Sequence, residues 1–119
     1  MFDFLRVASS YFPLEIKEVI WVDDNLIISG EAWSFSTLSV WRVSKGSELL
    51  FTCWDDPVEK GLMRLVGLSL ENISWININQ PIDPSLIFTD GSRLDVFSSF
   101  AQDPWVFRLP SGVTYVGNS

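Results

Sequence analysis

The sequence predicts a mainly β protein: an antiparallel β-sandwich, roll or half-barrel of about eight strands, with one short helix near residues 56–66. An α+β arrangement is the alternative. Residues that favour strands, namely Val, Ile, Phe, Trp and Thr, dominate the chain, and turn signals recur every eight to twelve residues. The 119 residues fit one domain, 1–119, and 47% of them are hydrophobic, including nine Phe, six Trp and two Tyr. A core or an interface is therefore built largely from aromatic rings.

The first thirty residues predict two strands after an ambiguous start. Residues 1–12 fit a helix or a strand, and Pro13 ends any helix there. Residues 14–22 predict one strand with imperfect alternation of polar and apolar side chains. The sequence Asp-Asp-Asn at 23–25 is typical of a turn, and the next strand follows at 25–30.

The stretch 31–44 predicts a long strand with a defect. Its apolar side chains change from odd to even positions near Ser36 and Thr37, so a β-bulge or a sharp bend is expected there to restore one apolar face. A turn at 44–46 leads to a strand at 47–54. The residues expected on one face of that strand are Leu49, Phe51 and Cys53.

The short helix is predicted from its first residues. Asp56 followed by Pro57 fits an N-cap and a first helical position, and Glu59 stands where a capping box places its acid. We expect one or two helical turns, and then a strand at 74–79.

Two hairpins are expected in the last third. A two-residue Asp-Gly loop would set Phe88 opposite Arg93, whereas a three-residue loop at 89–91 sets Leu86 opposite Leu94 and keeps one apolar face. The longer loop is therefore preferred, with Gly91 as its left-handed residue.

The second hairpin spans 105–116 and turns at Pro-Ser-Gly, which sets Leu109 opposite Val113 and Phe107 opposite Tyr115. Residues 84–117 are then expected to form a four-stranded meander with one apolar face.

The composition disfavours most catalytic chemistry. Histidine is absent, which removes the commonest general base and metal ligand, and Cys53 is the single cysteine and is expected to be a buried hydrophobe. No nucleophile motif or phosphate loop occurs, so no enzyme, no cofactor and no metal are expected. The paired carboxylates and Asp90, Asp95 and Asp103 are expected to be turn, cap and surface residues.

The net charge of −7 disfavours nucleic acid as a ligand and favours a basic protein partner. The start of the chain lacks the pattern of a secretory signal, and no apolar run approaches the ~20 residues of a membrane span, so we expect a cytoplasmic protein that binds no membrane.

The motifs "GEAWSFSTLSVWRV" and "LIFTDGSRLDVFSSFAQDPWVFRLPSG" resemble a diffuse class of small β-rich bacterial proteins of unknown function. These carry a tryptophan-containing middle strand, then an "LxFxDGxxLxV" hairpin and an "xPWxxxxP" strand. Some look like immunity proteins of polymorphic toxin systems, which bind a cognate toxin and block it, often through an acidic surface. The resemblance covers roughly residues 25–112 and carries over no individual site residue.

We therefore expect a non-enzymatic binding protein, in the manner of an immunity protein that neutralises a bacterial toxin. A self-associating module that forms a homodimer and a carrier of a small apolar ligand are the alternatives. The expected partner-binding residues are Asp23, Asp24, Asp55, Asp56, Glu59, Trp33 and Trp54.

Overall fold

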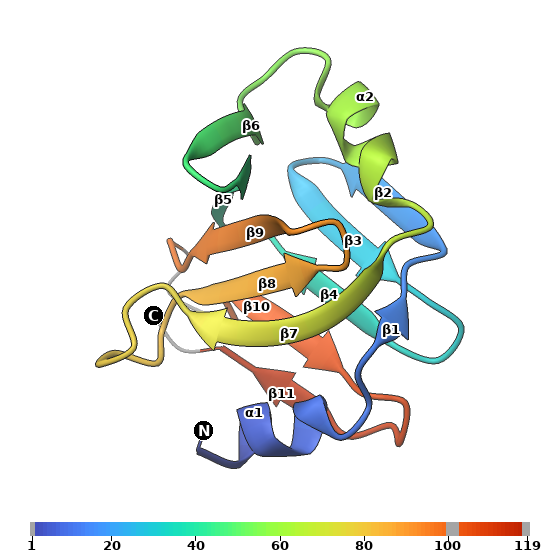
Figure 1. Ribbon diagram of the computed structural model, residues 1–119, viewed down its shortest axis with the longest axis vertical. Coiled ribbons are helices and arrows are strands. Elements are labelled where there is room, and N and C mark those ends of the chain that lie inside the picture. Colours follow the sequence, from blue (N-terminus) through green and yellow to red (C-terminus); the bar gives the residue numbers. More distant parts are fainter. Residues whose placement is uncertain (1, 100–102, 118–119) are drawn as a thin grey trace.

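The structure is a computed structural model that describes residues 2–99 and 103–117. Within them the chain is mainly β and forms two antiparallel sheets, which confirms the expected sandwich-like arrangement (Figure 1). The described strands number eleven rather than about eight, in part because two predicted strands each divide where the chain passes between the sheets. Met1 of the first segment and residues 100–102 of the predicted meander lie outside the described residues.

Each sheet combines strands from distant parts of the sequence. The six-stranded sheet has the order β1 (Leu14–Glu15), β7 (Ser69–Trp75), β8 (Pro84–Phe88), β9 (Ser92–Phe97), β5 (Val40–Lys45) and β6 (Glu48–Thr52). The five-stranded sheet has the order β11 (Thr114–Val116), β10 (Trp105–Arg108), β4 (Ser34–Thr37), β3 (Asn25–Ser29) and β2 (Glu18–Val22). In the residues that the structure describes, three short helical segments accompany the sheets: α1 (Phe2–Ser9), α2 (Val58–Leu62) and the 3-10 helix η1 (Met63–Leu65).

The predicted strand 14–22 divides at Ile16. The Ile16 backbone N–H donates to the Leu68 carbonyl at 2.8 Å, just before β7, whereas the next N–H, that of Lys17, donates to the Ser29 carbonyl at 2.9 Å in β3. Consecutive residues therefore bond toward different sheets. This change of sheet is the physical reason for the imperfect alternation in the sequence.

The predicted strand 31–44 also divides, into β4 and β5. The expected sharp bend is present, but the expected change of apolar face is wrong. Leu38, on an even position, is 44% exposed at the bend. The buried apolar residues on both sides of the bend all occupy odd positions: Trp33, Phe35, Trp41 and Val43. The chain keeps its inward face while it crosses from one sheet to the other.

Buried hydroxyl groups hold this crossover in place. Thr37 Oγ1 and Ser39 Oγ donate to the same acceptor, the Pro104 carbonyl oxygen, at 2.6 and 3.0 Å. The crossover is therefore tied to the chain just before β10, which pairs with β4.

Three predictions in the middle of the chain are wrong. Leu49 is 57% exposed and does not share the buried face of Phe51, because a bulge shifts the β5–β6 register between Val43 and Ser44. Pro57, in extended conformation, occupies the N-cap position of α2, and no side chain caps the helix, so Asp56 is not its N-cap and the capping box with Glu59 does not form. A further strand lies at Ser69–Trp75 rather than at 74–79, because Leu70 and Ile73 are buried in the core and the chain turns after Trp75.

Both hairpins form with the predicted registers. Leu86 is paired with Leu94, Gly91 has a φ of +87°, and Phe107 is paired with Tyr115. The four-stranded meander is wrong, since β8 and β9 belong to the six-stranded sheet and β10 and β11 to the other. Each hairpin turns its apolar side toward the shared core. The alternation of apolar residues is the same whether the two hairpins lie in one sheet or in two facing sheets, so the sequence pattern could not separate these cases.

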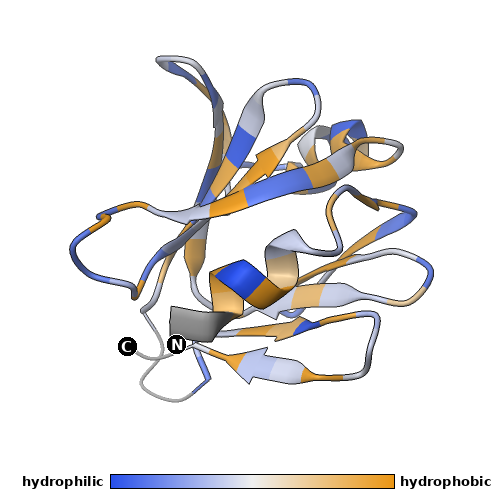
Figure 2. Cartoon of the chain, turned by 60° about the horizontal axis from the view of Figure 1, so that its bottom comes forward, coloured by the Kyte–Doolittle hydropathy of each residue, from blue (hydrophilic) through white to orange (hydrophobic). Residues whose placement is uncertain are grey.

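Short helical segments close the edges of this core. Segment 1–12 contains the helix α1, which lies across one end of the space between the sheets (Figure 2). Phe4 of α1 places its ring 5.2 Å from that of Trp105 and 5.0 Å from that of Tyr115, measured between centroids. Val58 and Leu62 of α2 are buried as well.

Candidate functional site

Three loops meet at one end of the sandwich and form a hollow of ≈ 220 Å³. They are the β2–β3 turn, the β4–β5 crossover and the segment that follows β6. The residues that line the hollow are Trp21, Asp24, Leu38, Ser39, Val40, Cys53 and Trp54. Cys53, which was expected to be buried, is only half-buried in this lining. Small-molecule sites commonly span roughly 300–1,000 Å³, so this hollow has the size for a side chain of a partner rather than for a large ligand.

Trp54 is the most exposed aromatic residue of this surface, with 75% of its area open to solvent. A tight turn after β6 holds it there, because the Trp54 backbone N–H donates to Thr52 Oγ1 at 3.2 Å. Asp55 fixes the same turn, since its carboxylate accepts hydrogen bonds from the Thr52 backbone N–H at 3.2 Å and from the Thr52 hydroxyl at 3.4 Å. The indole is thus presented outward on an ordered turn.

Apolar and acidic groups surround this indole. Leu38, 44% exposed, and Asp24 line the same hollow as Trp54. Asp23 and Asp24 have φ values of 53° and 62° and form the two-residue turn itself, as expected from the sequence. We name this region, defined by Asp24, Leu38, Trp54, Asp55 and Asp56, the Trp54 surface.

The structure brings some of the predicted contact residues together and leaves others apart. Asp24 and Trp54 line one hollow, and Asp55 and Asp56 are exposed next to Trp54 in the chain. Glu59 is exposed on helix α2. Trp33 is only 5% exposed, and its Nε1 donates to the Glu15 carbonyl at 3.0 Å, so it is a core residue with a structural hydrogen bond.

A second hollow, of ≈ 360 Å³, lies at the other end of β4. Trp33 contributes one wall of it together with Arg108 and Pro110. The rest of its lining comes mostly from the loops 30–34 and 109–112. The hollow is therefore a shallow depression between two surface loops and not a cavity inside the sandwich.

Sequence reasoning missed a buried carboxylate on the outer side of the six-stranded sheet. Asp95 was expected on a polar face, but its side chain is only 3% exposed. It accepts a hydrogen bond from Ser85 Oγ at 2.7 Å, and the Nε atoms of Arg42 and Arg93 lie 3.1 and 3.5 Å from its oxygens. The available signal was the predicted β8–β9 register, which places Ser85 opposite Asp95 and Arg93 on the same face of the strand. A carboxylate with a hydroxyl and an arginine as neighbours can be buried, because both groups stabilise its charge.

Asp90 fixes the β8–β9 turn. Its Oδ1 accepts hydrogen bonds from the Ser92 backbone N–H at 2.8 Å and from the Ser92 hydroxyl at 2.5 Å. Partial burial acts to raise the pKa of Asp90, but these hydrogen bonds and the nearby Lys45 ammonium outweigh it and leave the pKa below its usual value.

Neither a metal cluster nor a membrane-spanning helix occurs in the described part of the chain. In residues 2–99 and 103–117, no group of three or more Cys, Asp or Glu side chains is arranged to hold a metal ion. No helix in the same residues has the length and apolar character needed to cross a membrane.

Comparison with known proteins gives no relative from which to argue. No protein-family model matches the chain, and neither a curated protein nor a solved structure matches it.

Proposed function

We propose that this chain is a non-enzymatic binding protein that recognises a basic protein partner through the Trp54 surface. The observation that carries the proposal is Trp54 itself, an indole 75% exposed on an ordered turn beside a hollow. Tryptophan is among the commonest anchors of protein interfaces, and its exposure in a monomer leaves apolar area that a partner can bury.

Charge supports the choice of a basic partner. Asp24, Asp55 and Asp56 are all exposed on this surface, and the whole chain has a net charge of −7. Carboxylates at the rim attract lysine and arginine side chains and increase the rate of encounter, while the indole and Leu38 contribute the apolar contact. A cationic side chain can also lie over the face of the Trp54 ring.

The biological form that we propose is an immunity protein, which binds a toxin and covers its basic active site or its substrate-binding surface. The acidic charge of the chain and the exposed Trp54 indole support this form. An immunity role requires no catalytic group in this chain, because the active site that is blocked belongs to the toxin.

The test is co-expression with the product of the neighbouring gene, followed by measurement of cell growth and of binding by calorimetry. We expect the wild-type chain to restore growth and to form a stable complex. Trp54→Ala should weaken binding by about 2 kcal/mol or more, as is typical of a hot-spot aromatic, while stability to urea changes by less than about 0.5 kcal/mol because the ring is exposed.

Matched controls separate this surface from general effects of charge and apolar area. Asp24→Asn should slow association, whereas Glu31→Gln, which removes an exposed acid at the other end of β4, should not. Ile78→Ala removes a side chain that is 81% exposed elsewhere and should leave binding intact. A neighbouring product that is harmless, or that remains toxic beside this chain, would rule out the immunity role.

Self-association is a second candidate, and the edge strand β2 favours it. Its sequence from Val19 to Val22 contains no charged residue, and a strand edge of this kind can pair with another copy. Sedimentation at low micromolar concentration decides the matter: a monomer counts against the homodimer, and a dimer that Ile20→Lys dissociates supports it. A carrier of an apolar ligand is less well supported, because aromatic rings from α1 and both sheets occupy the space between the sheets.

A further inference from the structure

The outer face of the six-stranded sheet carries an ion cluster that the proposed function does not use. Arg42 of β5 is paired with Asp95 of β9, and Arg93 lies two residues before Asp95 on the same face. Asp95 is the buried centre, with Arg42 Nε at 3.1 Å and Arg93 Nε at 3.5 Å from its two oxygens. Ser85 from β8 donates a third interaction at 2.7 Å.

The cluster contains more positive charge than the buried carboxylate requires. Two guanidinium groups and one carboxylate sum to a net charge of +1 in an otherwise acidic chain. One arginine together with the Ser85 hydroxyl already gives Asp95 an opposite charge and a hydrogen bond, which are the usual requirements of a buried carboxylate. The second guanidinium therefore adds a cation that no acid of the cluster neutralises.

Both guanidinium groups approach Asp95 through Nε. The side chains of Arg42 and Arg93 are 46% and 47% exposed, and in the part of the chain that the structure describes their Nη atoms make no hydrogen bond. Arg42 also contacts Phe97, with its Cζ 5.2 Å from the centre of that ring. A guanidinium held in this way presents a fork of two N–H donors that matches the two oxygens of a carboxylate.

A buried hydroxyl on the same face also lacks a partner. Ser44 is paired with Arg93 across the β5–β9 register and is only 8% exposed, yet within the described residues its Oγ has no hydrogen-bond partner. Since buried polar groups are nearly always satisfied, an unpaired hydroxyl beside the two guanidinium groups is a second sign that the face is incomplete without a ligand.

We propose that Arg42 and Arg93, oriented by Asp95, form a binding site for a single carboxylate group. A carboxylate carries one negative charge, which balances the net charge of +1, and it accepts two parallel hydrogen bonds from a guanidinium fork. Phosphate monoesters carry a charge nearer −2 at neutral pH, and the acidic chain as a whole repels polyanions. The site is independent of the Trp54 surface and of the partner proposed for it.

The test is titration of the isotope-labelled protein with sodium acetate at constant ionic strength, with chloride as the compensating ion. The chain has five arginines, so the Nε–H signals of Arg42 and Arg93 can be assigned individually by NMR. We expect both signals to shift along one saturable curve with acetate and to remain unchanged with chloride.

Variants distinguish the fork from plain positive charge. Arg93→Gln keeps the Arg42–Asp95 pair, so the fold is retained, and should weaken acetate binding at least about tenfold, as expected for loss of a charge-assisted hydrogen bond. Arg93→Lys keeps the charge but not the fork and should also weaken binding several-fold. Arg108→Gln, an exposed arginine of the other sheet, is the matched control and should bind acetate as the wild type does.

Three results would overturn the proposal. The first is a linear shift without saturation, which indicates general screening. The second is unchanged acetate affinity in Arg93→Lys, which shows that the fork has no role. The third is saturable binding of inorganic phosphate without any response to acetate, which assigns the site to another class of anion.

Discussion

At the residue scale, two carboxylates of the β8–β9 hairpin have opposite environments. Asp90 is exposed at the turn and organises it through Ser92, whereas Asp95, five positions later, is buried beneath two arginines. Sequence reasoning predicted the turn because Asp-Gly is a strong local signal, and it missed the burial because neighbouring strands supply the arginine and serine that make it tolerable. Local chemistry could be read from the sequence, but the depth of each group in the sheet could not.

Replacement of Asp90 by Asn should reduce stability in a pH-dependent way. The pKa of Asp90 is lowered in the folded chain, so the charged form contributes stability above the unfolded pKa and that contribution is lost as pH falls through the folded pKa. Urea unfolding should show a deficit for the variant near pH 7, less than about 1 kcal/mol because the group is largely solvated, and the deficit should shrink below about pH 4. Equal deficits at pH 7 and pH 3 would contradict a role for the charge.

At the scale of elements, the sequence predicted strand positions and hairpin registers better than their assignment to sheets. The three-residue loop of the β8–β9 hairpin and the Phe107–Tyr115 pair follow from apolar alternation, which is a local property. The crossover at 38–39 was recognised as a bend, but its partner, the Pro104 carbonyl, is more than sixty residues away. The crossover residues line the hollow beside Trp54. The sequence could therefore suggest individual contact residues, but it could not show which of them lie together around this hollow.

Gly30 permits a close contact between the β3–β4 loop and β1, and Gly30→Ala should destabilise the fold. A Cβ at this position would meet Trp33 Nε1 and the Glu15 carbonyl, the two partners of a 3.0 Å hydrogen bond. Displacement of the indole should cost about 2–4 kcal/mol, from overpacking and the lost hydrogen bond together. Urea unfolding measures this cost.

Gly46→Ala is the matched control for that substitution. Gly46 has a φ of 62°, and a Cβ added there would have no atom within 4 Å, so only the backbone preference is lost, at about 1–2 kcal/mol. If Gly30→Ala were no more destabilising than Gly46→Ala, the indole contact would not be a constraint on the fold.

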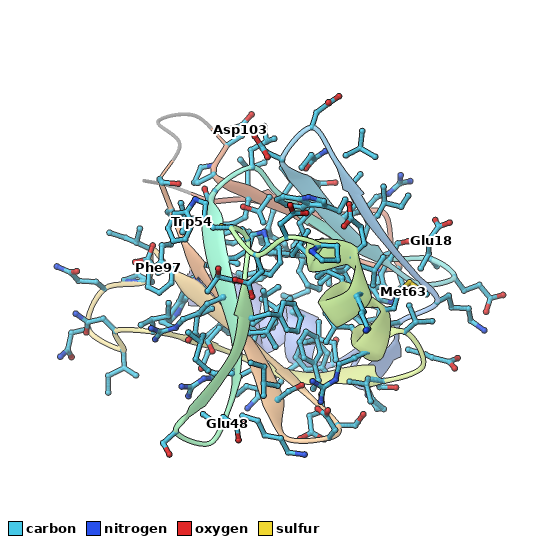
Figure 3. All side chains as sticks on the ribbon, turned by 90° about the horizontal axis from the view of Figure 1, so that it is seen from above. Glu18, Glu48, Trp54, Met63, Phe97 and Asp103 are labelled. Atoms are coloured by element: carbon cyan, nitrogen blue, oxygen red, sulfur yellow. The ribbon has the colours of Figure 1, made fainter. Side chains whose placement is uncertain are left out.

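At the scale of the whole molecule, two sheets and the helix α1 share one cluster of buried side chains. Figure 3, viewed from above, shows Trp54 and Phe97 on one side of the molecule and Met63 on another. Trp54 belongs to the proposed protein-binding surface, and the Phe97 ring contacts Arg42. The β strand that connects the two regions is β5, whose Val40 lines the hollow and whose Arg42 contacts Asp95. A rigid core thus presents two surfaces of opposite charge.

Phe4→Ala should show how much the helix α1 contributes to the stability of the sandwich. Phe4 is 1% exposed and contacts aromatic rings of both sheets, including Trp75 and Phe107. We expect a loss of about 3–5 kcal/mol in the free energy of unfolding, together with increased binding of a hydrophobic dye at the opened end. Leu5→Ala, at a half-buried position of the same helix, should cost less. Unchanged stability in Phe4→Ala would mean that the sheets pack without the helix.

The order of strands in the five-stranded sheet has a consequence for biosynthesis. β4 follows β3 directly, but its other neighbour, β10, begins at Trp105, so most of the chain must leave the ribosome before that edge is covered. Until then a nascent β2–β3–β4 unit presents Leu26, Ile28 and Phe35 without the strands that bury them. High contact order of this kind slows folding and prolongs exposure of strand edges. Chaperone binding to the nascent chain should therefore be strongest between the emergence of β4 and that of β10.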